Sequence, residues 1–237
     1  MDSCSAIGVP ALGAQTPGEM MQTIHVESHP LLDAVWIQCC FPNGLSQEST
    51  PGLLAQLHPD ADAPLAVGEC NKKAVRDLLR HGGFKPAGRS KPACEYLIKA
   101  ASGGFLGPIN RAVDVCNVVS LHSGLPISVV DLERVNGGLS VAVAPPSSNY
   151  TFNASGQVMD LSGLICLGDI DGPCANAVKD SQRTKTHEDT HSCMYLIWGT
   201  TDLPGLAGHA ADWLEVLLDQ EGAVDIQRCR NCGDAEI

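Results

Sequence analysis

The sequence predicts an α+β fold in which mixed β-sheets pack with helices in a single domain. Segments of strand length and segments of helix length are interspersed without the strict alternation of a parallel α/β sheet. The chain has 237 residues, enough for one large core, and no internal repeat divides it. Residues 1–20 are rich in Ser, Gly, Pro and Ala, so we expect a flexible tail there and the folded domain at residues 21–237.

The first hundred residues predict two strands followed by two helices. The strands are expected at residues 21–26 and 34–40, and the helices at residues 71–81 and from Ser90 to about residue 101. A loop with a helical turn at residues 53–57 separates the strands from the helices. Gly82-Gly83 ends the first helix, and Ser90 is expected to cap the second.

Residues 110–131 form the central unit, a helix, a turn and a strand. Apolar residues recur at helical spacing up to Gly124, and β-branched or small residues follow Pro126. Three polar side chains, Asn110, Asp114 and Asn117, share one stripe of this helix. They either hold the turn through backbone hydrogen bonds or contact a ligand.

The second half of the chain is expected to consist mainly of strands. Alternating or continuous apolar runs predict strands at residues 139–144, 150–153, 157–161, 164–167 and 193–198. Residues 154–156 are expected to form a hairpin turn and residues 168–173 a tight turn. A final helix is expected at residues 206–220, with an apolar stripe along one face.

The charge of the chain is unevenly distributed. The formal net charge is −12, which argues against a general DNA-binding or RNA-binding protein. Residues 72–111 nevertheless hold nine of the fifteen Lys and Arg residues against two acidic residues, a local charge of +7. This segment is either a solvated helix face or a surface that contacts phosphates.

Cysteine usage and hydropathy indicate a reducing compartment. The eleven cysteines show no spacing typical of a disulfide framework, and no secretory signal precedes them, so we expect free thiols and a cytoplasmic protein. Cys229-x-x-Cys232 is half of a zinc or redox motif, with no second pair to complete it. No apolar run reaches the ~18 residues of a membrane helix.

Two further stretches carry residues suited to chemistry. The polar segment 179–186 offers cations for a phosphate or carboxyl group, and hydroxyls and a carboxylate for an amine or water. His187-Glu188-x-x-His191 has the spacing of a zinc hydrolase motif, which requires a helix that presents both histidines on one face. The neighbouring residues lack the apolar stripe of such a helix, so we expect no metal site here.

The sequence resembles a known family. The matching stretches are residues 89–95 (Arg-Ser-Lys-Pro-Ala-Cys-Glu), residues 113–119 with Gly124-x-Pro126 and Asp131, and residues 178–185. They resemble the B3/B4 module of the bacterial phenylalanyl-tRNA synthetase β subunit, which deacylates wrongly charged tRNA. The resemblance is closer to the free-standing relatives of this module, such as the canavanyl-tRNA deacylases, and covers roughly residues 70 to 220. It implies that residues 21–237 form a B3/B4-like domain.

The resemblance also implies a set of site residues. Catalytic roles fall to Asn117, Asp180 and Ser181, and tRNA contacts to Lys85, Arg89 and Lys91. The substrate-binding residues would be Asn110, Asp114, Cys116, Ser128, Asp131, Lys179, Thr184 and Lys185. In the synthetase module Thr occupies the position of Cys116 and a pocket His that of Ser128, so the accepted amino acid should differ from tyrosine. The family uses an ordered water rather than a covalent nucleophile, and it implies neither metal nor cofactor.

The resemblance therefore predicts a free-standing trans-editing factor. It would hydrolyse the ester of a mischarged aminoacyl-tRNA, which could carry canavanine or another non-cognate amino acid. It would bind the acceptor end of the tRNA, and we expect neither DNA nor a membrane as a partner. The alternative is a binding module of the same fold that recognises an amino acid or a tRNA end without hydrolysis. A zinc hydrolase that uses His187 and His191 is a lesser alternative.

Overall fold

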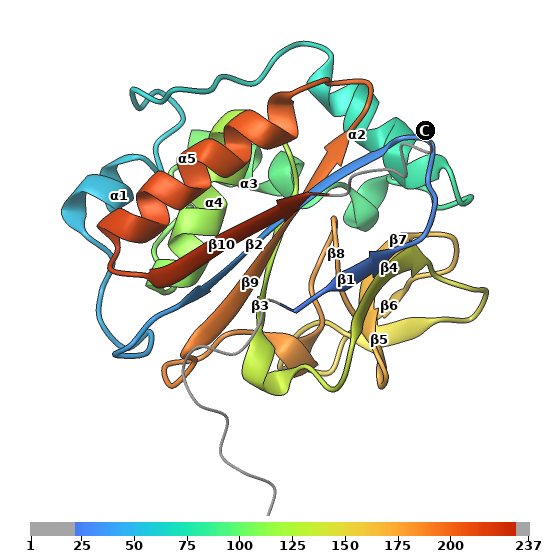
Figure 1. Ribbon diagram of the computed structural model, residues 1–237. Helices are drawn as coiled ribbons and strands as arrows, with labels where there is room; N and C mark the ends of the chain where they lie inside the picture. Colours follow the sequence, from blue (N-terminus) through green and yellow to red (C-terminus); the bar gives the residue numbers. More distant parts are fainter. Residues whose placement is uncertain (1–21, 231–237) are drawn as a thin grey trace, which may run out of the picture.

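A four-stranded antiparallel sheet in the order β10-β2-β9-β3 runs through the middle of the protein (Figure 1). Its strands are β10 (Val224–Arg230), β2 (Leu32–Cys40), β9 (Ser192–Thr200) and β3 (Ile127–Asp131). The computed structural model describes residues 22–230. The predicted tail and Cys232 lie outside the described residues.

The central sheet is buried on both faces. Side chains of a strand alternate between the two faces of a sheet, and here Val35, Ile37 and Tyr195 pack against helices, whereas Trp36 and Trp198 pack against a second sheet. This double burial explains why β9 reads as one continuous apolar run. Two apolar clusters therefore share the central sheet, one on each side.

The helical layer contains α4 (Arg111–Ser123) and α5 (Leu206–Gln220), with the short α1 (Pro51–Ala55) beside them. The helix α4 is buried at every position except Val113. Asn110 caps its N-terminus by accepting a hydrogen bond from Val113 N, and Gly124, with φ 69°, ends it in the left-handed conformation that favours glycine. The sequence predicted the end of this helix at Gly124, whereas it placed Asn110 inside the helix rather than at its cap.

The second sheet has the order β1-β4-β7-β8. Its strands are β1 (Ile24–Val26), β4 (Leu139–Val143), β7 (Ile165–Asp169) and β8 (Gly172–Asn176). A two-stranded hairpin, β5 (Asn149–Thr151) and β6 (Val158–Asp160), lies beside it (Figure 1). The mixture of sheets and helices confirms the predicted α+β class.

Two further helices, α2 (Asn71–Arg80) and α3 (Ala93–Ser102), complete the fold, with 3-10 turns η1 (Gly88–Ser90), η2 (Leu132–Arg134) and η3 (Gln182–Thr184). The expectation that Ser90 caps α3 was wrong. Ser90 belongs to η1, and Pro92 occupies the cap position without a side-chain hydrogen bond.

Two strands were missed. Residues 168–173 were expected to be only a turn, but β7 continues to Asp169 and β8 starts at Gly172. The strand β10 was not predicted because most of its side chains are exposed and it lacks the apolar pattern of a core strand. No helix among residues 22–230 is long and apolar enough to cross a membrane.

Candidate functional site

A pocket of about 490 Å³ opens between α3, α4, the free edge of β3 and the segment 176–186. Its walls are mainly apolar and include Leu97, Val113, Ile127, Val129 and Val178. Six of the residues predicted from the sequence line it: Asn110, Cys116, Asn117, Lys179, Asp180 and Lys185. A pocket that is largely apolar with a few polar groups is typical of small-molecule sites.

The three polar residues that were predicted to share one helical stripe have different roles. Asn110 caps the helix and donates from Nδ2 to Thr186 Oγ1 at 3.2 Å. Asp114 is fully buried and accepts hydrogen bonds from Ser49 Oγ at 2.6 Å and Ile109 N at 2.8 Å. Among the described residues, none forms a hydrogen bond with the side-chain amide of Asn117, which is 8% exposed and lines the pocket. Asn117 therefore keeps a donor and an acceptor available to a ligand.

Asp180 forms a carboxylate in the wall of the pocket. Its Oδ1 accepts hydrogen bonds from Ser128 Oγ at 2.7 Å and from Asn176 N at 3.2 Å. Burial raises the pKa of Asp180 to about 6, although these hydrogen bonds and the charge of Lys185 act in the opposite direction. Ser128 is 1% exposed and supports Asp180 from behind rather than lining the pocket. Asp180 can therefore gain or lose a proton near neutral pH.

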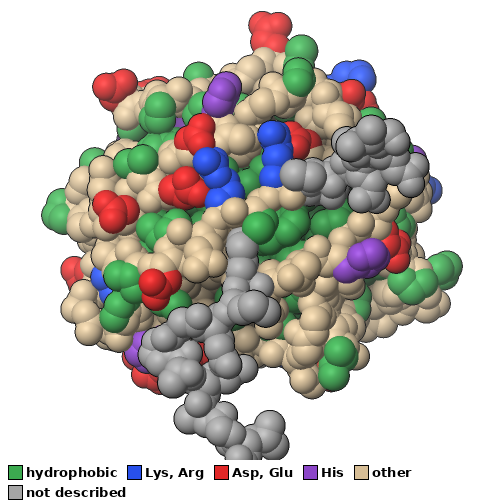
Figure 2. All heavy atoms as spheres, viewed as in Figure 1, with side chains coloured by type: hydrophobic (Ala, Val, Ile, Leu, Met, Phe, Trp, Pro, Cys, Tyr) green, Lys and Arg blue, Asp and Glu red, His purple; other side chains and the backbone are tan. Residues whose placement is uncertain are grey.

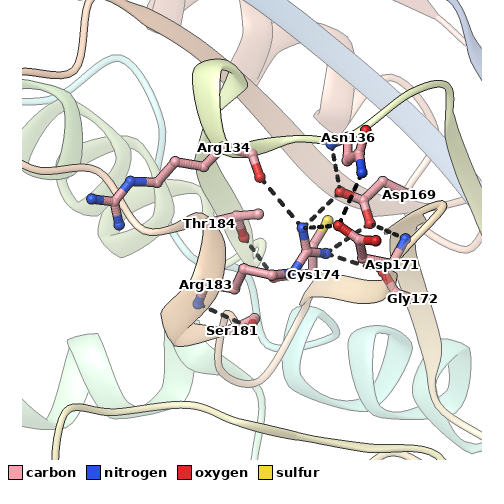
Figure 3. Close-up of polar contacts among 9 residues, drawn as sticks. All are labelled: Arg134, Asn136, Asp169, Asp171, Gly172, Cys174, Ser181, Arg183 and Thr184. Carbon is pink, nitrogen blue, oxygen red and sulfur yellow. Dashed lines mark hydrogen bonds and ion pairs between the residues drawn. The ribbon is translucent and has the colours of Figure 1, made fainter.

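Ser181 and Thr184 anchor the segment that carries Asp180 (Figure 3). Ser181 Oγ accepts from Arg183 N at 3.2 Å, and Thr184 Oγ1 donates to Cys174 O at 3.1 Å. Arg183 binds both carboxylate oxygens of Asp169, at 2.7 and 2.8 Å. Burial opposes ionisation of Asp169, but the Arg183 guanidinium holds its pKa below the usual value. Both hydroxyls lie outside the pocket lining, in the base of the loop.

Asp131 lies away from the pocket, among the residues of the zinc-like motif. It is fully buried and accepts a hydrogen bond from Thr190 Oγ1 at 2.7 Å. His187 Nε2 lies 3.2 Å from the same carboxylate. Residues 187–191 form a turn rather than a helix, and His191 Nδ1 lies 3.1 Å from Phe41 O. Residues 22–230 contain no group of three His, Cys, Asp or Glu side chains that could hold a metal. The helix that the zinc alternative requires is therefore not present at this motif.

Cys116 lines the pocket but is not suited to act as a nucleophile. Its thiol donates to Ile127 O at 3.3 Å, and burial raises its pKa far above the usual value. The thiol therefore stays protonated, and a protonated thiol is a poor nucleophile. Its sulfur can still set the shape of the pocket at this position.

A second cavity, a groove of about 700 Å³, adjoins the pocket at Lys179, which lines both. Its other cationic lining residues are Lys85 and Arg89, and its acidic one is Asp160. Asp160 accepts two hydrogen bonds from Ser162, at 2.7 and 2.9 Å. Lys91, the third predicted tRNA-binding residue, is partly buried and does not line the groove. The groove thus carries an excess of positive charge in an acidic protein.

Cations of the basic segment lie in different environments. On α2, Lys73 and Arg80 pair with Asp77 at 2.7 Å each, and Arg76 pairs with Glu95 at 2.6 Å. No described acidic residue forms an ion pair with either Lys85 or Arg89. The α2 cations match the solvated helix face considered above, whereas the groove cations keep their full charge for a ligand.

Basic side chains on another face are also paired. On the face shown in Figure 2, Lys and Arg side chains lie beside Asp and Glu side chains. Arg228 and Arg230 of β10 bind Asp212 at 2.6 Å and Asp33 at 3.0 Å. These pairs leave little net positive charge on the side chains of β10.

Two supporting residues, Tyr150 and Asn176, were not identified from the sequence. Tyr150 donates to Lys179 O, and Asn176 Nδ2 donates to the Tyr150 hydroxyl. Asn176 Oδ1 accepts from Val178 N at 2.8 Å and Lys179 N at 3.0 Å. They fix the backbone at Lys179 and Asp180. No local pattern signals them, because the contacts join segments that are distant in the sequence.

Comparison with known proteins finds a family match for part of the chain. Residues 88–199 match the family described as the B3/4 domain. All residues that line the pocket fall between positions 93 and 186, inside this B3/4 match. No curated protein matches the chain.

One solved structure is similar over much of the chain. It is an N-terminal fragment of the phenylalanyl-tRNA synthetase β subunit from Pyrococcus horikoshii, with 10% sequence identity and a TM-score of 0.48. The match covers 88% of this chain and 54% of that one, so the protein spans about half the length of the fragment.

Proposed function

We propose that this protein is a free-standing trans-editing factor that hydrolyses the ester between a non-cognate amino acid and the terminal ribose of a tRNA. The observation that carries the proposal is the junction at Lys179 between a mainly apolar pocket and a cationic groove. An aminoacylated 3′ end has the complementary parts: an amino acid, a ribose ester and a chain of phosphates. The B3/4 match over the pocket residues supports this reading. We expect the protein to act in the cytoplasm.

The pocket residues suit hydrolysis by water. Asn117 has a free amide that can orient a water or donate to the carbonyl oxygen as negative charge develops there. Asp180, with its pKa near 6, can take a proton from the water as that water adds to the ester carbon. The ester C–O bond then breaks, and the ribose oxygen takes the proton back as it leaves. The products are a free amino acid and a tRNA with its terminal hydroxyl restored.

The groove residues suit the RNA. Lys85, Arg89 and Lys179 can neutralise phosphates next to the ester, so binding should weaken as salt rises. The acidic total of the chain is compatible with this role if only the acceptor end is bound. Asp131, Ser181 and Thr184 would act by holding the structure around the site.

A binding module without hydrolysis is the second candidate. No histidine lines the pocket within residues 22–230, and Ser128 is held by Asp180 and Trp198. Such a protein would bind an amino acid or a tRNA end but release no product.

A deacylation screen tests the proposal. Purified protein is incubated with a panel of mischarged tRNAs, and the release of free amino acid is measured against the spontaneous rate. Release from at least one member, lost in Asn117→Ala, supports the editing function. Tight binding of a non-hydrolysable aminoacyl-tRNA analogue with no release from any member would favour the binding module.

A further inference from the structure

The β5–β6 hairpin contributes one wall of the cationic groove. Its residues Phe152, Gln157, Val158 and Met159 line the groove together with Lys85 and Arg89. Tyr150 of the hairpin also contacts the pocket segment, because its hydroxyl donates a hydrogen bond to the backbone oxygen of Lys179. The hairpin is therefore in position to influence both cavities.

Phe152 contacts both lysines of the pocket segment. The ammonium of Lys179 lies over the Phe152 ring, 4.1 Å from its centroid. Lys185 Nζ donates to the backbone oxygen of Phe152 at 2.6 Å. One residue of the hairpin thus holds two cations at the place where the groove meets the pocket.

The groups that hold Lys179 and Lys185 in place are uncharged, which affects what these lysines can bind. A carboxylate neutralises the cation it holds, as Asp77 does for Lys73. An aromatic face and a carbonyl oxygen are uncharged, so they restrict the movement of an ammonium without cancelling its charge. A lysine that is held in this way loses less conformational entropy when a phosphate binds.

We propose that Phe152 is a positioning residue that presents Lys179 to a phosphate of a single-stranded RNA 3′ end. This inference rests on the proposed function and adds the hairpin to the RNA-binding surface. The phosphate would enter from the groove, where Lys179 lies with Lys85 and Arg89. Phe152 acts through Lys179 rather than on the ester, so its loss affects RNA binding.

A double-mutant cycle tests this role, with a short labelled single-stranded RNA ending in CCA as the probe. Phe152→Leu keeps an apolar side chain and the backbone oxygen but removes the aromatic face. Lys179→Met keeps the stem of the lysine but removes its charge. Phe152→Tyr is the conservative rescue, and Thr151→Ala is the matched control on an exposed hairpin position outside the groove lining.

Phe152→Leu should weaken RNA binding roughly two- to ten-fold, the effect expected when one long side chain has to be ordered on binding. The slope of log K against log salt should become shallower by up to about 0.7, the value for one phosphate contact on a single strand. In the Lys179→Met background, Phe152→Leu should cause no further loss, because both changes remove the same contact. Phe152→Tyr and Thr151→Ala should bind like the wild-type protein.

Other outcomes separate this inference from the proposed function. If Phe152→Leu weakens binding equally in both backgrounds, or leaves it unchanged, the positioning role is wrong while the editing function stands. If the wild-type protein binds the RNA with this pattern but hydrolyses no mischarged tRNA, the editing function fails and the positioning role stands. If the wild-type protein shows no salt-dependent RNA binding, both are overturned. A lower melting temperature with unchanged affinity would show that Phe152 only supports the fold.

Discussion

Replacing Asp180 with Asn should make the protein more stable at neutral pH and inactive. The folded protein disfavours the Asp180 carboxylate, because burial raises its pKa from 3.8 to about 6. A shift of about 2 units corresponds to about 3 kcal/mol of cost for the ionised form. The amide introduced by Asp180→Asn carries no charge, and its oxygen could still accept the hydrogen bonds from Ser128 and Asn176 N that Asp180 Oδ1 receives.

The pH dependence gives the sign of this effect. At pH values below 3.8, the pKa of Asp180 in the unfolded chain, Asp180 is neutral in both the folded and the unfolded protein and does not lower the free energy of unfolding. As pH rises from 3.8 to about 6, the unfolded chain loses the proton first, and the wild-type protein loses stability. The stability of Asp180→Asn minus that of the wild type should therefore increase by about 2.5 kcal/mol between about pH 4 and about pH 8.

Urea unfolding of both proteins at the two pH values measures this difference. Asp160→Asn is a control of opposite sign, because hydrogen bonds from Ser162 lower the pKa of that exposed carboxyl. Its stability relative to the wild type should fall as pH rises through the range below about 4, where that carboxyl ionises, and should change little between about pH 4 and about pH 8. The reasoning is refuted if the difference for Asp180→Asn is the same at both pH values. The same variant should lose about 10²–10⁴ in deacylation rate if Asp180 is the base.

Four further predictions follow from the site. Asn117→Ala should lower the deacylation rate by about 10²–10³ with an unchanged melting temperature, since the described structure offers its amide no hydrogen-bond partner to lose; a lower melting temperature with full activity per folded molecule would assign it to the scaffold. Arg89→Ala should make the salt dependence of tRNA binding shallower by about 0.7 to 0.9, and an unchanged slope would remove the groove from the RNA surface. Asn110→Ala should lower the free energy of unfolding by about 1 kcal/mol, because α4 loses its N-cap; chemical denaturation measures this, and no change would show that the cap is not needed. Deacylation by the wild-type protein should rise with pH through about 6 as Asp180 ionises, and a flat profile from pH 5 to 8 would exclude it as the base.

The local structure of the central unit followed from the sequence alone. Gly124 ends α4 as predicted, because a left-handed glycine at a helix end depends on neighbours a few residues away, whereas the capping role of Asn110 emerged only from the structure. The continuous apolar run of β9 likewise indicated a strand, and the structure buries it on both faces. Such features can be predicted because their physical causes act over short distances along the chain.

The site itself depended on tertiary structure. The sequence could not tell which of three polar residues on one helical stripe would contact a ligand. In the structure Asp114 is hydrogen-bonded to Ser49 and Asn110 to Thr186, whereas the amide of Asn117 has no such partner among the described residues. The basic segment was uniform in sequence, and ion pairs with Asp77 and Glu95 separated its paired cations from those of the groove. Phe152 contacts lysines about thirty residues away in the chain. Local pattern determined which side chains can carry chemistry. Contacts between distant segments decided which of them line the pocket or the groove, and which keep a donor, an acceptor or a net charge there, because those contacts fix where each side chain lies and which of its polar atoms are already satisfied.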